Sequence, residues 1–152
     1  MSDLVTDVAE YVIAMPTLQE RVQALEAEMR KHPETPIPVR HYFANGLYAR
    51  EITIPADVMA VGKIHKTQHI NVLSSGEVTM LTENGPLKVA APYTWVVEPW
   101  KKAAAYAHSE STWTSFCVNP TDERDLVKLE EALIEKPQAE QVEDVWPSSQ
   151  LP

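Results

Sequence analysis

The segment 62–85 constrains the fold of this chain more than any other stretch of the sequence. It holds two histidines four residues apart, His65 and His69, and then two apolar runs, each followed by a turn sequence with a glycine, Gly76 and Gly85. Such turns are typical of β-hairpins, because glycine adopts the positive φ angles that tight turns need. The segment therefore predicts neighbouring strands beside potential metal ligands.

Short strands are predicted throughout residues 37–118, with little helix between them. The expected strands are Val39–Phe43, Leu47–Ile54, Val58–His65, His69–Ser74, Glu77–Thr82, Leu87–Val89, Tyr93–Val97, Ala103–Ala107 and Thr112–Val118. Many short strands at regular spacing favour a sandwich or a barrel. We therefore expect a mainly β domain at residues 37–120.

The first 36 residues are expected to form a helical segment and a proline-rich connector. Residues 2–32 have a helical pattern that is broken at Pro16, and Thr17 and Glu20 form a capping box for the second part. Behind this box, apolar residues recur at helical spacing on one narrow stripe, namely Leu18, Val22, Leu25 and Met29. The stripe must pack either on the barrel or on a neighbouring subunit.

A last helix is expected at residues 121–135, with Thr121 as its cap. Its predicted buried face consists of Leu126, Val127, Leu129 and Leu133. Residues 136–152 have the composition of an extended tail, but several of them are apolar, namely Val142, Val145, Trp146 and Leu151. We expect this tail, like the N-terminal helix, to contact a sister subunit or another assembly partner.

Composition excludes some classes of partner and location. The 152 residues suit one domain, and the net charge of −9 disfavours binding to DNA or RNA, although a local cationic pocket for a small anion is compatible with it. The single cysteine, Cys117, allows no internal disulfide and is expected to be buried. The acidic N-terminus argues against a signal peptide, and no apolar stretch has transmembrane length. A cytoplasmic protein is expected, without membrane contact.

Several segments, in order along the chain, resemble the small RmlC-like cupins that tailed phages and prophages encode. These segments lie at residues 41–43, 48–55, 62–65, 69–73, 76–79, 91–94, 106–108 and 112–114. The resemblance implies a cupin double-stranded β-helix, or jelly-roll barrel, with N-terminal helices and a C-terminal helix. It also implies a place in the host cytoplasm or in a virion. The group has no common activity, so the resemblance is specific for fold rather than for function.

Two departures from the metal-binding cupin pattern weaken the expectation of a four-ligand site. The usual glutamate position falls on or beside His69, and the leading histidine pair is reduced to His65. In the second signature, after Pro99, the glycine is missing and Ala104 stands where a histidine is usual.

A smaller metal site is still compatible with the sequence. On one straight strand His65 and His69 would lie about 13 Å apart, but a turn at 66–68 would bring them together. With His108, and with His41 as a further donor, they would offer imidazoles to zinc, iron, nickel or copper. The alternative is that the two rings fill a polar barrel mouth and form hydrogen bonds, for which the candidate partners are Glu51, Tyr48 and Asn71.

The same residues form a candidate ligand pocket. We expect Arg50 either to face the barrel interior, where a buried guanidinium needs a carboxylate or a bound anion, or to face outward and pair across strands. The candidate ligand-binding residues are Arg50, His65, His69, Tyr106 and His108. The candidate metal ligands are His65, His69 and His108.

Three functions fit these features, and the sequence favours them in this order. The first is a non-catalytic, oligomeric accessory protein, encoded by a phage and acting in the virion or on the host. The second is a binder of a small molecule in the barrel pocket. The third is a metal-dependent isomerase, dioxygenase or lyase, with Tyr106 or His108 in acid–base roles. No catalytic residue is assigned for the favoured function.

Overall fold

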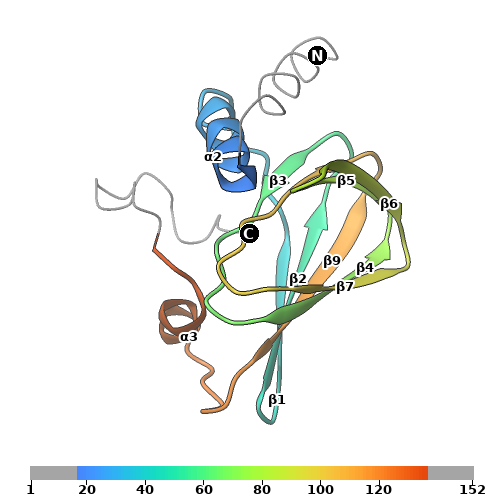
Figure 1. Ribbon diagram of the computed structural model, residues 1–152. Coiled ribbons are helices and arrows are strands. Elements are labelled where there is room, and N and C mark those ends of the chain that lie inside the picture. Colours follow the sequence, from blue (N-terminus) through green and yellow to red (C-terminus); the bar gives the residue numbers. More distant parts are fainter. Residues whose placement is uncertain (1–16, 137–152) are drawn as a thin grey trace.

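The computed structural model describes residues 17–136, which form two antiparallel β-sheets and two helices (Figure 1). The five-stranded sheet has the order β1 (Val39–Ala44), β2 (Leu47–Ile54), β9 (Ser111–Val118), β4 (His69–Ser75) and β7 (Tyr93–Val97). The four-stranded sheet has the order β3 (Met59–Val61), β8 (Ala104–Ala107), β5 (Glu77–Thr82) and β6 (Gly85–Ala90). The helices are α2 (Leu18–Met29) and α3 (Leu126–Leu133).

The two sheets face each other and enclose the main apolar core. Every second residue of β2 and β9 points inward. Buried members of this core such as Ile54, Leu73 and Val78 are at most 1% exposed. The expected mainly β architecture is therefore confirmed, and each of the nine predicted strands is present. The first part of the predicted N-terminal helical segment, at residues 2–15, and residues 137–152 of the predicted tail lie outside the described part of the chain.

Two predicted element boundaries are wrong. The strand expected at Val58–His65 ends at Val61, because the chain leaves β8 there and His65 pairs instead with Ile134, just after α3. The final helix begins at Leu126, and its cap is Asp125 rather than Thr121. The Asp125 carboxylate accepts hydrogen bonds from the first helical N–H groups, so the preceding residues are left as a loop.

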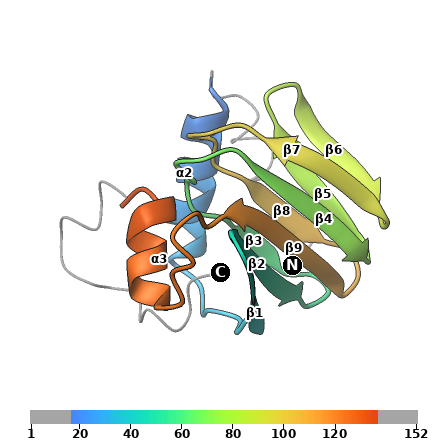
Figure 2. The ribbon, with the colours of Figure 1, turned by 90° about the horizontal axis from the view of Figure 1, so that it is seen from below.

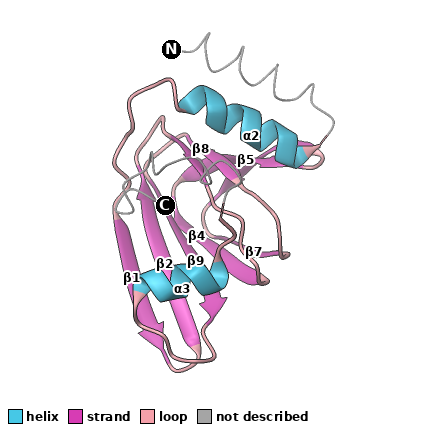
Figure 3. Ribbon diagram, turned by 90° about the vertical axis from the view of Figure 1, so that its left-hand side faces the viewer, coloured by secondary structure: helices cyan, strands magenta, loops and turns pink. Residues whose placement is uncertain are grey.

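Helix α2 packs on its own barrel. Its predicted capping box is present, since the Thr17 hydroxyl accepts from the Glu20 N–H and the Glu20 carboxylate accepts from the Thr17 N–H. Val22 and Leu25 are buried in a cluster with Ala104 of β8. Of the two alternatives for the apolar stripe, the structure thus shows the intramolecular one. Both helices lie on the same side of the barrel, α2 beside the four-stranded sheet (Figures 2 and 3).

The turn between β4 and β5 depends on a glycine. Gly76 has φ +89°, and a Cβ atom built on it would lie 2.2 Å from the Ser111 Oγ and 2.5 Å from the Glu110 carbonyl oxygen. No other residue fits this position without a shift of the Glu110 backbone. The lack of a side chain at Gly76 allows the start of β9 to lie this close to the turn. Among residues 17–136 there is no helix of the length and apolarity needed to cross a membrane.

Candidate functional site in the barrel

A cavity of about 300 Å³ lies inside the barrel. Its walls come from the inner face of the five-stranded sheet, from β3 and β8 of the other sheet, and from α3. Pockets for small molecules span roughly 300–1,000 Å³. The barrel is therefore not fully plugged by its core side chains, and the space suits a small ligand.

A row of polar side chains crosses the inner face of the five-stranded sheet. The cross-strand register aligns His41 with Arg50, Arg50 with Ser115 and Ser115 with Asn71. All four line the cavity. The Ser115 hydroxyl donates to the Asn71 Oδ1 over 2.7 Å, so these two side chains satisfy each other in part. Arg50, for which the sequence left two orientations open, thus faces inward, in the middle of this row.

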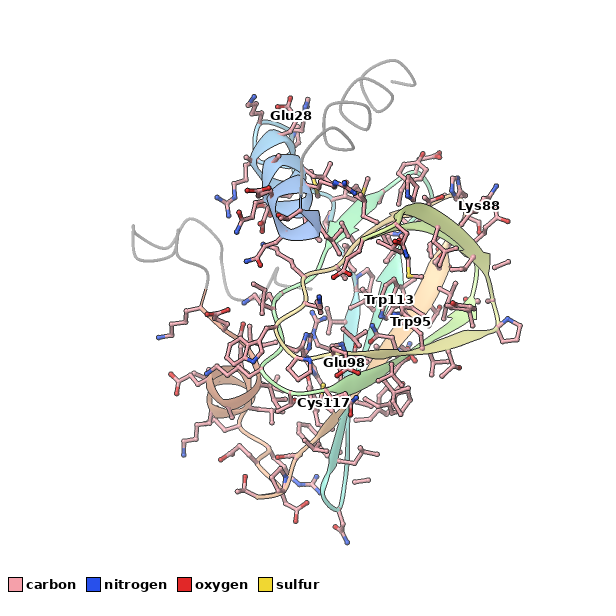
Figure 4. All side chains as sticks on the ribbon, in the orientation of Figure 1. Glu28, Lys88, Trp95, Glu98, Trp113 and Cys117 are labelled. Carbon is pink, nitrogen blue, oxygen red and sulfur yellow. The ribbon has the colours of Figure 1, made fainter. Side chains whose placement is uncertain are left out.

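An apolar row lies next to the polar one, further into the barrel. Its register pairs Ile52 with Trp113, Trp113 with Leu73 and Leu73 with Tyr93. Ile52 and Trp113 line the cavity. The Trp113 ring meets the Trp95 ring edge to face at 4.7 Å between their centroids, and both lie between the sheets (Figure 4). The cavity is therefore polar on one side and apolar on the other.

His65 and His69 meet at the polar end of the cavity. A bend at Lys66 and Thr67 turns the chain back, and the two ring centroids lie 4.1 Å apart. Burial is the main reason that the pKa of His65 is lowered to about 4, and the neighbouring His69 and Arg50 contribute in the same direction. Burial also lowers the pKa of His69. Both imidazoles are therefore neutral at neutral pH, each with one donor and one acceptor nitrogen.

Tyr48, Cys117 and His41, which also line the cavity, are neutral at pH 7. Burial raises the pKa of Tyr48 to about 12 and that of Cys117 to about 11. The Tyr48 hydroxyl lies 2.7 Å from the His41 Nδ1, and burial lowers the pKa of His41. Cys117 is 1% exposed, which confirms the predicted buried thiol. Neither Tyr48 nor Cys117 has the anionic form that a nucleophile needs.

Helix α3 covers one end of the cavity. The sequence predicted the helix but not this position for it. Leu129 and Leu133 pack on Tyr48 and Cys117. The Lys63 ammonium group forms an ion pair with Glu130, and both residues line the cavity.

Backbone contacts hold the end of the helix to the segment that carries His65. The Lys66 N–H donates to the Leu133 carbonyl over 2.7 Å, and the Glu135 N–H donates to the Ile64 carbonyl over 2.9 Å. The apolar spacing of α3 indicated a buried face, but nothing in the sequence showed that this face closes the cavity.

Tyr106 and His108, two predicted site residues, lie elsewhere. Both belong to the region of β8, and neither lines the cavity. The Tyr106 hydroxyl donates to the Asp57 carboxylate over 2.9 Å, and the His108 Nε2 lies 2.6 Å from the Thr79 Oγ1. Their rings contact each other edge to face. The structure therefore brings Arg50, His65 and His69 together and separates them from this pair.

The described residues do not fit a resident transition metal. Within residues 17–136, no group of three or more His, Cys, Asp or Glu side chains is arranged to hold an ion. His65 and His69 supply two imidazoles, while His108 is bound to Thr79. Ala104 lines the cavity and has no donor atom. Two imidazoles fall short of the three protein ligands that catalytic zinc sites use.

Comparisons with known proteins identify the architecture. No protein-family model and no curated protein sequence matches the chain. Among solved structures, KdgF from Halomonas sp. aligns with a TM-score of 0.51 at 13% identity, over 64% of this chain and 94% of its own. An RmlC-like cupin from Shewanella frigidimarina aligns with a TM-score of 0.50 at 13% identity, over 63% and 85%. This protein has the cupin fold.

Another solved structure aligns with a lower score. An acetylacetone dioxygenase from Acinetobacter johnsonii aligns with a TM-score of 0.47 at 16% identity, over 57% of this chain and 65% of its own. At these identities the likeness concerns the fold, and the predicted cupin barrel is confirmed. The function has to be argued from the side chains of the cavity.

Proposed function

We propose that this cupin is a non-catalytic protein that binds a small organic molecule inside its barrel. The observation that carries the proposal is the cavity of about 300 Å³, with a polar row beside an apolar row on one sheet. Small-molecule sites combine mostly apolar walls with a few convergent polar groups, as this cavity does. The predicted pocket residues Arg50, His65 and His69 contribute the polar groups.

The chemistry of the lining favours binding over catalysis. Tyr48 and Cys117 stay protonated at neutral pH because burial raises their pKa values. The described donor set also fails to fit a metal. These two observations about the described residues support binding over metal-dependent catalysis.

Nuclear magnetic resonance with small probes tests the proposal. We expect a six-carbon amide, amine or carboxylate to shift the indole signal of Trp113, which lines the cavity. The indole of Trp100, which is 54% exposed, is the internal control and should not move. If no probe of any charge shifts the Trp113 signal, the cavity is not a ligand site and the proposal is wrong.

A second candidate is the accessory role in an assembly that the phage-group resemblance implies. The observation that favours it is an apolar row on the outer face of the five-stranded sheet. Register aligns Tyr42 with Ala49, Ala49 with Phe116, Phe116 with Ile70 and Ile70 with Val96. Tyr42, Ile70 and Val96 are between 45% and 56% exposed. An apolar row across a whole sheet face marks a surface that another protein can cover.

A further inference from the structure

The charged residues of the cavity wall are mostly cationic, although the protein is acidic. Arg50, Lys63 and Lys101 line the cavity, and within residues 17–136 Glu130 is the only carboxylate that does. This wall therefore carries a net charge of +2, whereas the whole chain carries −9. An excess of positive charge in a concave, partly apolar site attracts anions and discriminates against cations.

All three cations interact with carboxylates, and Glu130 also favours the charged form of Arg50. Lys63 pairs with Glu130 of α3, and Lys101 pairs with Glu83 over 2.5 Å. Arg50 differs from them in position, because it lies at the centre of the polar row between His41 and Ser115. Burial lowers its pKa, so an anion in the cavity would stabilise its charged form.

The neighbours of Arg50 complete a head-group site. On one side, Ser115 and Asn71 supply a hydroxyl and an amide. On the other, His65 and His69 are neutral, and each uses its N–H on the backbone, at Lys63 and Thr67 respectively. The guanidinium suits a carboxylate, which accepts two parallel N–H bonds from arginine and a further bond from the Asn71 amide N–H group.

The apolar row sets the rest of the ligand. Ile52 lies two residues beyond Arg50 on β2, and Trp113 lies two residues before Ser115 on β9. Because successive inward residues on a strand are separated by two positions, each apolar side chain is the inward neighbour of a polar one. A molecule with its head group at Arg50 would extend along the strands onto Ile52 and Trp113.

We propose that the ligand is a small amphipathic carboxylate, with its carboxylate on Arg50 and its hydrocarbon part against Ile52 and Trp113. This inference rests on the proposed function and specifies its ligand class. The cavity volume of about 300 Å³ limits the hydrocarbon part to a short chain or a single ring.

Titrations with matched probes test this ligand class. Hexanoate, hexanamide, hexylamine and acetate are titrated while the Trp113 indole signal is followed. Hexanoate should bind at least tenfold more tightly than hexanamide, because only the carboxylate forms a charge-assisted pair with Arg50. It should also bind at least tenfold more tightly than acetate, which lacks the hydrocarbon part.

Two variants locate the head group. Arg50→Gln should reduce the hexanoate affinity at least tenfold and leave hexanamide within about twofold. The matched control is Arg40→Gln, one register position beyond His41 on the exposed edge strand β1, and it should change neither affinity. If Arg50→Gln does not fold, the ratio of hexanoate to hexanamide affinity in the unmodified protein decides the question.

The possible results separate the two proposals. Equal binding of hexanoate and hexanamide would overturn the carboxylate assignment while leaving a ligand cavity. Acetate binding as tight as hexanoate would remove the apolar row from the site and overturn the amphipathic class. Binding of no probe would overturn the carboxylate assignment and the proposed function together.

Discussion

Burial gives His65 its unusual acid–base behaviour. The ring lies 4.1 Å from that of His69, near Arg50 and beneath α3. The protonated ring would therefore lack hydration and be repelled by positive charge. The pKa is therefore about 4 in the folded protein, against 6.5 for the unperturbed side chain. Between these two values the unfolded chain binds a proton that the folded protein does not.

Acid should therefore destabilise the protein through His65. As pH falls below 6.5 the unfolded state is protonated first, so the free energy of unfolding decreases until the pH approaches 4. From pH 7.5 to pH 5 we expect a loss of about 2 kcal/mol from this residue. Urea unfolding at the two pH values measures it. His65→Gln should lose less stability over this range than the unmodified protein.

Equal pH dependence in His65→Gln and the unmodified protein would show that His65 is not the buried, neutral group described above.

Strand alternation alone did not decide the direction of single residues such as Arg50. The sequence left two orientations of Arg50 open, and its register with Ser115 in the structure decides between them. Tyr106 and His108 were misplaced because their contacts are long-range. Thr79, which pairs with Tyr106 in register and bonds to His108, comes from a strand whose order in the sheet the sequence does not reveal.

At the scale of elements, the five-stranded sheet has two faces with different roles. The inner face carries the polar and apolar rows of the cavity, whereas the outer face carries the apolar row from Tyr42 to Val96. A monomer would expose this apolar row to water, which is unfavourable. We propose that the homo-oligomer expected from the sequence forms through this face, with a second copy of the chain covering the row.

Replacement of Ile70 by lysine tests this assembly. Ile70 is 45% exposed at the middle of the outer row, so a charge there would be buried in an interface between two copies. We expect light scattering to show the unmodified protein as a dimer and Ile70→Lys as a monomer. Val127→Lys, on α3 and 66% exposed, should remain a dimer. A monomeric unmodified protein would contradict the assembly.

The elements themselves were mostly predictable because local patterns determine them. Alternation and glycine turns predicted every strand, and the Thr17 capping box predicted the start of α2. The start of α3 was not predictable, because Asp122 has φ +51° and the Asn119 side chain forms hydrogen bonds with the Glu123 backbone. These contacts hold residues 119–125 in a loop that helical periodicity does not anticipate.

At the scale of the whole molecule, the cavity is a product of tertiary packing. The barrel supplies its walls, while α3 joins the segment 64–66 and closes one end. The sequence pattern indicated a barrel with inward polar residues. It did not indicate the cavity volume or the helix that covers it, since both depend on how distant elements meet.

A crystal structure of the protein soaked with hexanoate tests the ligand cavity most directly. We expect density inside the barrel, with the carboxylate at Arg50 and the chain against Trp113. Density confined to the outer surface, with the interior unchanged at saturating probe, would contradict a ligand site in this barrel.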